Sequence, residues 1–117
     1  MLGLSPSYRY YLFHGSVDMR KGVFSLSELV RSQLRSSPTD PSNVYIFMAK
    51  SRKVVKILRY ERGFFVLYEK RPVHGKFRKP VLDTSGGKYQ ISWSDMVMLT
   101  EGLETRSMRI LRVDNGD

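Results

Sequence analysis

Apolar and polar residues alternate with two different periods along the chain. Residues 8–13 are rich in aromatic side chains and lead into His14-Gly15, a composition that predicts a strand. Apolar residues then recur at steps of three and four positions, which predicts a helix over residues 18–35. Asp18 is the expected N-cap, because its carboxylate can accept hydrogen bonds from the free N–H groups of the first turn. The apolar stripe of this helix consists of Met19, Val23, Leu26, Leu29, Val30 and Leu34.

Strand-like runs dominate the middle of the chain. Residues 36–43 predict a loop, because two prolines and several small polar residues cannot continue a helix. Three apolar runs follow, at residues 44–49, 54–60 and 64–71. The polar spacers between them are short, which predicts tight antiparallel hairpins.

The last third of the chain predicts two short strands and a second helix. The strand candidates are residues 76–79 and 88–91. The helix is expected over residues 93–102, with Ser92 or Ser94 as its N-cap and with Gly102 at the position where a glycine commonly ends a helix. The side chains that it should turn toward the core are Trp93, Met96, Val97 and Leu99 or Thr100.

Together these elements predict an α+β fold, a small antiparallel sheet of short strands in a meander with two helices. A chain of 117 residues that is 41% hydrophobic and 12% aromatic is typical of one folded domain. We expect this domain to cover residues 1–104. Residues 105–117 are expected to form a basic, flexible C-terminal tail, with arginines at positions 106, 109 and 112.

No part of the sequence predicts association with a membrane. The longest apolar run, residues 44–49, is six residues long, far short of the roughly 20 that cross a bilayer. The N-terminus lacks the charged start, the long apolar stretch and the cleavage site of a signal peptide. The cytoplasm is therefore the expected location.

Positive charge is concentrated in one segment. The chain carries a net charge of +9, and residues 50–80 hold eleven of its basic residues against two acidic ones, while the remaining residues sum to zero. Such a distribution predicts one basic face and favours a polyanion, DNA above all, as the partner. A basic face that serves only solubility is the alternative reading.

Two arrangements make phosphate contact by particular residues plausible. Arg20-Lys21 stand at the predicted start of the first helix, where free N–H groups and cations together suit a phosphate. Bases also alternate with aromatic residues along the predicted strands, as on a nucleic-acid platform, with Lys56 and Arg59 on opposite faces of one strand. The alternative is that the aromatic rings form the core and the bases only edge the sheet. The expected nucleic-acid-binding residues are Arg20, Lys21, Arg52, Lys53, Lys56, Arg59, Lys70, Arg71, Lys76, Arg78 and Lys79.

No motif predicts a catalytic, metal or cofactor site. The chain has no cysteine, and its two histidines, His14 and His74, lie 60 residues apart. No serine stands in a nucleophile-elbow motif. A metal-dependent nuclease would need clustered carboxylates, and it remains a third hypothesis because the candidates are isolated in the sequence: Asp18, Glu61, Glu69, Asp83 and Asp95. We therefore expect a protein that is not an enzyme.

Several blocks of residues together resemble one known family. The first is the run of residues 10–22, Tyr-Tyr-Leu-Phe-His-Gly-Ser-Val-Asp-Met-Arg-Lys-Gly, followed by Leu26, Leu29 and Val30. Further matches are Val44 to Phe47, Lys56 to Leu58, Gly63-Phe64, Leu67-Tyr68, Lys70-Arg71, Gly75, Phe77, Pro80, Leu99 and Glu101-Gly102. With these blocks the chain resembles, over residues 8–103, the small accessory protein encoded by the second open reading frame of bacterial insertion sequence family 66.

The chain departs from this family at three places. The family usually has Trp-Asp where this chain has Tyr60-Glu61, Leu where it has Pro72, and Trp where it has Lys79. Tyr60-Glu61 keeps an aromatic residue followed by an acid. Pro72 removes a strand N–H at the expected edge of the hairpin.

The resemblance implies a part in transposition beside a separate, much larger transposase, without a known set of catalytic residues. Our leading hypothesis is a non-enzymatic accessory factor that binds DNA through its basic surface. The alternative is a protein-interaction module that docks on the transposase without touching DNA, using arginines among exposed aromatic residues such as Tyr8, Tyr10 and Tyr60.

Overall fold

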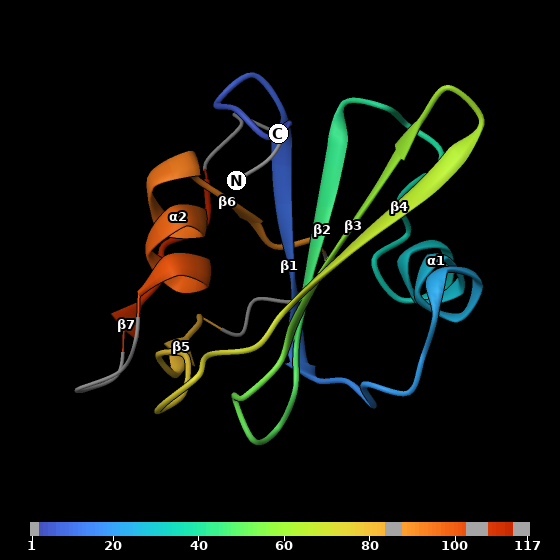
Figure 1. Ribbon diagram of the computed structural model, residues 1–117. Coiled ribbons are helices and arrows are strands. Elements are labelled where there is room, and N and C mark those ends of the chain that lie inside the picture. The colour runs from blue at the N-terminus through green and yellow to red at the C-terminus, as the bar shows by residue number, and fades with distance from the viewer. Residues whose placement is uncertain (1–2, 84–87, 103–107, 114–117) are drawn as a thin grey trace.

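The computed structural model describes residues 3–83, 88–102 and 108–113 and confirms the predicted α+β fold. Two helices accompany a five-stranded sheet and a small two-stranded sheet (Figure 1). The elements in chain order are β1 (Arg9–Ser16), α1 (Val23–Ser32), β2 (Asn43–Met48), β3 (Val55–Glu61), β4 (Phe64–Lys70), β5 (Pro80–Val81), β6 (Gln90–Ile91), α2 (Trp93–Glu101) and β7 (Met108–Arg109). Neither helix is long and apolar enough, in the part of the chain described, to span a bilayer.

The main sheet is mixed, which corrects the expectation of an antiparallel sheet. Its strand order is β4-β3-β2-β1-β6. Strands β2, β3 and β4 form the predicted antiparallel hairpins, but β1 pairs with β2 in parallel, and with β6 antiparallel. The connection between β1 and β2 contains α1, which carries the chain back to the starting end of the sheet, as a parallel pair requires.

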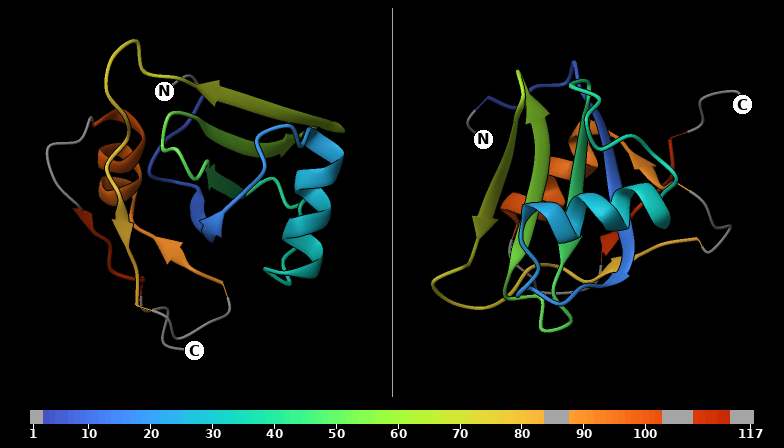
Figure 2. Two further views of the ribbon diagram at one scale, coloured as in Figure 1. Left: turned by 90° about the horizontal axis from the view of Figure 1, so that it is seen from below. Right: turned by 90° about the vertical axis from the view of Figure 1, so that its right-hand side faces the viewer.

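Both faces of the sheet are covered, one by each helix. Alternate residues of the central strands point to opposite sides, so that Tyr10 and Ile46 join α2 in one core while Tyr11 and Tyr45 join α1 in the other. Figure 2 shows the sheet standing between α1 and α2. All six residues of β2 are buried, because this strand lies in the middle of the sheet with a layer on each face.

Helix α1 is shorter than predicted and begins later. Its N-cap is Gly22, which offers no side-chain hydrogen bond, so Asp18 is not the cap. Instead the Asp18 carboxylate accepts from the backbone N–H of Arg20 at 2.9 Å, which closes a separate turn before the helix. The predicted apolar stripe still faces the core, since Leu26, Val30 and Leu34 are buried.

Helix α2 agrees closely with the prediction. The Ser92 hydroxyl accepts from the backbone N–H of Asp95 at 3.0 Å, so Ser92 rather than Ser94 is the N-cap. Gly102 ends the helix with an extended backbone, and a Cβ at this position would lie 2.7 Å from the carbonyl oxygen of Met98. The absence of a side chain there lets the chain leave the helix next to its last turn.

The C-terminal segment contributes to the core, contrary to the expectation of a tail over residues 105–117. Strand β7 pairs with β5, and Met108 and Ile110 are buried on either side of the exposed Arg109. This alternation of apolar and basic residues is that of a half-buried strand, too short to be recognised as a period. The expected tail residues 105–107 and 114–117, like the expected boundary at 104, lie outside the described residues. The predicted strand at 76–79 is replaced by β5, and that at 88–91 is reduced to β6.

Candidate nucleic-acid interface

The strand directions bring several chain segments together at one end of the sheet. The parallel strands β1 and β2 both finish there, β3 begins there, and β4 finishes there, with Lys70 opposite Val55. The turn between β2 and β3 and the segment between β4 and β5 both lie at this end, which is the lower end in Figure 1. The basic residues of two distant stretches of sequence can therefore share one surface.

A pair of hydrogen bonds joins these two stretches. The backbone N–H of Phe77 donates to the carbonyl oxygen of Arg52 at 2.8 Å, and Nη1 of Arg52 donates to the carbonyl oxygen of Phe77 at 3.3 Å. Phe77 itself is only 3% exposed and anchors the segment in the core. We call the resulting surface the basic end of the sheet and define it by Lys50, Arg52, Lys53, Lys76, Arg78 and Lys79.

The residues of the basic end are accessible to solvent. Lys50, Lys53, Lys76 and Lys79 are exposed, and Arg52 and Arg78 are half-buried. Five of these six are among the nucleic-acid-binding residues expected from the sequence, and Lys50 begins the basic segment that was expected to form the surface. Arg52 adopts a positive φ of 59° in the turn, a conformation that costs a non-glycine residue roughly 1–2 kcal/mol.

Lys56 was expected to bind DNA, but the structure buries it. Its Nζ donates to the carbonyl oxygens of Met19 and Lys21, at 2.7 and 2.8 Å, and lies 3.8 Å from Glu69. Only 8% of its side chain is exposed. Lys56 therefore holds the loop that precedes α1 and does not present its charge to a ligand.

Arg59 is buried in the same way, on the opposite face of β3. Its Nη1 donates to the carbonyl oxygen of Gly3 at 3.0 Å, and its Nη2 donates to the Tyr8 hydroxyl at 3.0 Å. The guanidinium also lies 4.5 Å from the centre of the Tyr8 ring. Arg59 thus ties the N-terminal segment to the sheet.

The two bases at the end of β4 are held by acids. Nζ of Lys70 donates to the carbonyl oxygen of Thr100 at 2.8 Å and to the Glu101 carboxylate at 2.6 Å, so it closes the last turn of α2. Nε of Arg71 donates to Glu69 at 2.7 Å, and this bond lowers the pKa of the Glu69 carboxyl. Both charges are largely compensated where they stand.

Arg20 and Lys21 precede α1, so they do not stand inside its first turn as predicted. The Arg20 guanidinium, whose side chain is 91% exposed, binds the Asp18 carboxylate at 2.6 Å and holds the pKa of that carboxyl far below its usual range. Lys21 is half-buried and lines a hollow of about 340 Å³ together with His14, Ser16 and Asp18. The structure therefore keeps Lys21 near the basic end but gives Arg20 a carboxylate partner.

A second hollow opens on the other side of the same segment of β1. It has a volume of about 440 Å³ and is bordered by Lys50, Arg52 and Lys79, with His14 at its rim and Leu12 and Leu82 below. His14, Leu12 and Leu82 line this hollow without belonging to the basic end, and none of them was expected from the sequence to line a cavity. The one available signal was His14-Gly15, which interrupts an aromatic strand.

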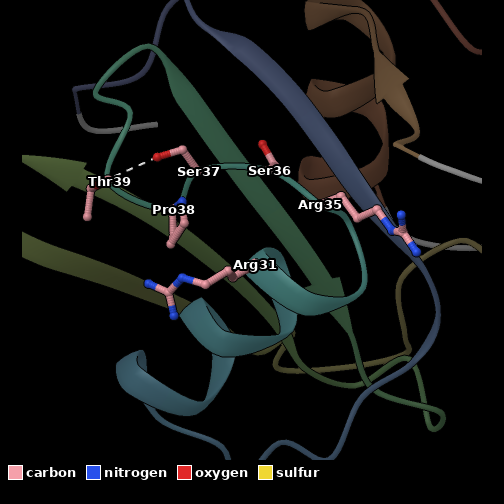
Figure 3. A pocket seen from close by; sticks show the side chains of 6 residues that line it. All are labelled: Arg31, Arg35, Ser36, Ser37, Pro38 and Thr39. Atoms are coloured by element: carbon pink, nitrogen blue, oxygen red, sulfur yellow. Dashed lines mark hydrogen bonds between the residues drawn. The ribbon is translucent and has the colours of Figure 1, made fainter.

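Basic residues also surround a hollow after α1, of about 540 Å³, but they do not converge on it. Figure 3 shows the Arg31 and Arg35 side chains pointing away from one another. Arg31 binds Glu28, and Ser37 and Thr39 share a hydrogen bond of 3.3 Å. This arrangement does not form a focused anion site.

Within residues 3–83, 88–102 and 108–113, no three histidine, aspartate or glutamate side chains come together as they would around a metal ion. Among the carboxylates considered from the sequence, Asp18 binds Arg20, and Glu69 binds Arg71.

Comparison with known proteins gives one family and one curated relative. The family model described as IS66 Orf2 like protein matches residues 8–110. The relative is a protein of Sinorhizobium fredii (strain NBRC 101917 / NGR234) that is named uncharacterized protein y4hO. It is 29% identical over 106 residues, which cover 91% of this chain and 90% of the relative. No solved structure matches the chain significantly.

Proposed function

The chain belongs to the IS66 Orf2 like protein family, and from this premise we propose that it is a non-enzymatic accessory factor of transposition that binds DNA through the basic end of the sheet. The family implies the accessory role in transposition. The contact with DNA is our addition. It rests on the accumulation of six cations on one surface, where four of them are exposed lysines.

The electrostatics of the basic end support phosphate binding. Lys50, Lys53 and Lys79 are exposed and make no ion pair with a carboxylate in the described part of the chain. Elsewhere several cations are matched by acids, as Arg20 is by Asp18 and Lys70 by Glu101. Uncompensated cations on an exposed surface attract a polyanion and release its counterions when it binds.

The test is a titration of duplex DNA at several salt concentrations with two triple variants of equal charge loss. The first combines Lys50→Gln, Lys53→Gln and Lys79→Gln at the basic end. The second combines Arg31→Gln, Arg35→Gln and Arg62→Gln, which are exposed and lie outside it. If about four bases contact phosphates, the wild-type slope of log affinity against log salt should be near −3.6, from roughly −0.9 per phosphate.

We expect the first triple variant to bind all duplex sequences more weakly and to lose up to about 2.7 of this slope, because each lost contact removes roughly 0.9. The second should keep nearly the wild-type slope. Equal losses in the two variants would assign the binding to overall charge, and the basic end would then not be the site. If the wild-type protein does not bind DNA, the proposal is wrong.

A second candidate function has its own observation. Phe24 of α1 is 75% exposed and packs edge-on against Phe65 of β4, with ring centres 6.0 Å apart, while Phe64 is 70% exposed. Exposed aromatic residues mark protein interfaces, so docking on the transposase is the alternative. Of the aromatic residues first considered for this role, Tyr10 is buried, and Tyr8 is half-buried beneath Arg59. Loss of transposition in cells by Phe24→Ser with Phe64→Ser, at unchanged DNA affinity, would favour docking.

A further inference from the structure

The hollow beside Lys50, Arg52 and Lys79 lies at the carboxyl ends of β1 and β2. These two strands form the parallel pair of the main sheet, and the strands on either side of them run antiparallel to their neighbours. In sheets with parallel strands, ligands commonly bind in the crevice outside the carboxyl ends, where the chain connections diverge. A volume of about 440 Å³ also falls within the range of small-ligand pockets.

A bulge in β1 shapes one wall of this hollow. Leu12 pairs with Ile46, and the next pair is Ser16 with Met48, so β1 advances by four residues while β2 advances by two. His14 and Gly15 lie in the bulge, and Gly15 has a positive φ of 103°. The His14 ring is exposed and lies tilted against Tyr89. Bulges of this kind redirect side chains next to functional sites.

The hollow combines a cationic rim with an apolar floor. Lys50 and Lys79 are exposed at its edge, with Arg52 beside them, and none of its twelve lining residues, all in the described part of the chain, is Asp or Glu. Leu12 and Met48 are buried below, and the half-buried Leu82 completes this floor. A small inorganic anion would use the rim but leave the floor empty. A ligand with a negative charge and a flat apolar ring would use both.

We propose that this hollow binds one unpaired nucleotide of a DNA strand, its phosphate at the Lys50 and Lys79 side chains and its base on Leu82 beside His14. This inference rests on the proposed DNA-binding function and deepens it. A duplex keeps its bases stacked inside the helix, so only a base that is extruded, or that belongs to a single-stranded end, can reach the floor. The protein therefore distinguishes DNA with an unpaired nucleotide from continuous duplex.

The experiment compares three DNA probes that share one duplex sequence: the blunt duplex, the duplex with a single-stranded overhang, and the same overhang carrying abasic sites. The wild-type protein should bind the overhang roughly tenfold more tightly than the blunt duplex, as expected when one base gains an apolar contact. The abasic overhang should lose this preference. A fluorescent base analogue in the overhang should report the transfer of the base from water to the floor.

Matched variants separate the hollow from the surrounding charge. Leu82→Gln makes the floor polar, whereas Leu111→Gln makes the same change at a leucine that is 65% exposed and does not line the hollow. Because Leu82 packs against the core and its variant could fail to fold, His14→Ala is the second variant, with His74→Ala as its control outside the hollow. Leu82→Gln and His14→Ala should lose the preference for the overhang and keep the duplex affinity, and the two controls should keep both.

The outcomes distinguish this inference from the proposed function. Equal affinity for the blunt duplex and the overhang would overturn the nucleotide site and leave DNA binding intact. Equal affinity for the abasic and the base-bearing overhang would also overturn it, because the hollow would then contact phosphate alone. Absence of binding to all three probes would overturn both proposals.

Discussion

Lys56 shows how a basic residue in a charged segment can belong to the core. Its ammonium group satisfies two backbone carbonyls of the loop before α1, those of Met19 and Lys21. A lysine that is almost fully buried must replace its lost hydration with such partners. The N-cap of α1, Gly22, has no side chain to fix the start of the helix. The hydrogen bonds from Lys56 therefore hold the loop before α1 in place against the sheet.

We expect Lys56→Ala to lower the free energy of unfolding by roughly 1–3 kcal/mol, because two carbonyl groups lose their charged donor inside the protein. Lys53→Ala removes the same charge from an exposed position nearby and should change the free energy of unfolding by less than about 0.5 kcal/mol. Urea unfolding followed by circular dichroism measures both. Equal stability of the two variants would show that the Lys56 contacts do not hold the loop.

The buried hydroxyl of Tyr45 makes stability sensitive to alkaline pH. It donates to the carbonyl oxygen of Ser37 at 2.9 Å and accepts from Nδ2 of Asn43 at 2.9 Å, with Ser36 Oγ 2.7 Å away. Burial raises the pKa of Tyr45 above its ordinary value of 10.0. As pH rises, the unfolded chain therefore loses this proton before the folded protein does. The contribution of the Tyr45 hydroxyl to the free energy of unfolding is complete below about pH 10, and it is lost as pH rises through the higher pKa of the folded state.

Tyr45→Phe should be less stable than the wild type at neutral pH by roughly 1–3 kcal/mol, since Asn43 and Ser37 lose their partner. Its stability should also decline less steeply above pH 10. Urea unfolding at a series of pH values measures both effects, with Tyr60→Phe as the control because that hydroxyl makes no hydrogen bond within the described residues. If stability declines equally steeply above pH 10 in the wild type and in Tyr45→Phe, Tyr45 is not the group that makes stability sensitive to alkaline pH.

At the scale of elements, the start of α2 depends on one of two neighbouring serines. The Ser92 side chain caps the helix, whereas Ser94 is exposed within the first turn. Ser92→Ala should cost roughly 0.5–2 kcal/mol of stability, because the N–H of Asp95 loses its acceptor. Ser94→Ala should leave stability unchanged or slightly higher, since alanine is the better helix former. Denaturant unfolding of the two variants measures these changes. A larger loss of stability in Ser94→Ala than in Ser92→Ala would show that Ser92 is not the N-cap.

Elements that depend on local pattern could be predicted, and pairings that depend on the whole chain could not. The hairpins of β2, β3 and β4 follow from three short apolar runs with short turns between them. The parallel pairing of β1 with β2 carries no local signal, because it depends on where α1 returns the chain. Strands β5 and β7 have two residues each, too few to show any period.

The candidate site, too, could be predicted only in part from the sequence. The concentration of bases in residues 50–80 predicted a basic surface, but not which of its members reach solvent. Lys56 and Arg59 stand in the run Val-Val-Lys-Ile-Leu-Arg-Tyr, where each shares a strand face with apolar residues. Both faces of β3 are covered, so both bases turn inward. The hollow beside Lys50, Arg52 and Lys79 could not be predicted, because it is formed by a bulge and by three segments that are distant in the sequence.

On the scale of the whole molecule, the position of β1 sets the order in which the protein can be completed during its synthesis. β1 is near the beginning of the chain, yet Tyr10 pairs with Ile91, about eighty residues later. A ribosome that adds roughly 5–20 residues per second needs roughly 4–16 s to cover that distance. Throughout this interval the edge of β1 that pairs with β6 has no partner, and the core that α2 covers is exposed to solvent. The nascent chain thus carries a strand with one unpaired edge until residues 90–91 have been synthesised, and a ribosome that stalls before residue 90 leaves that edge exposed to pairing with other chains.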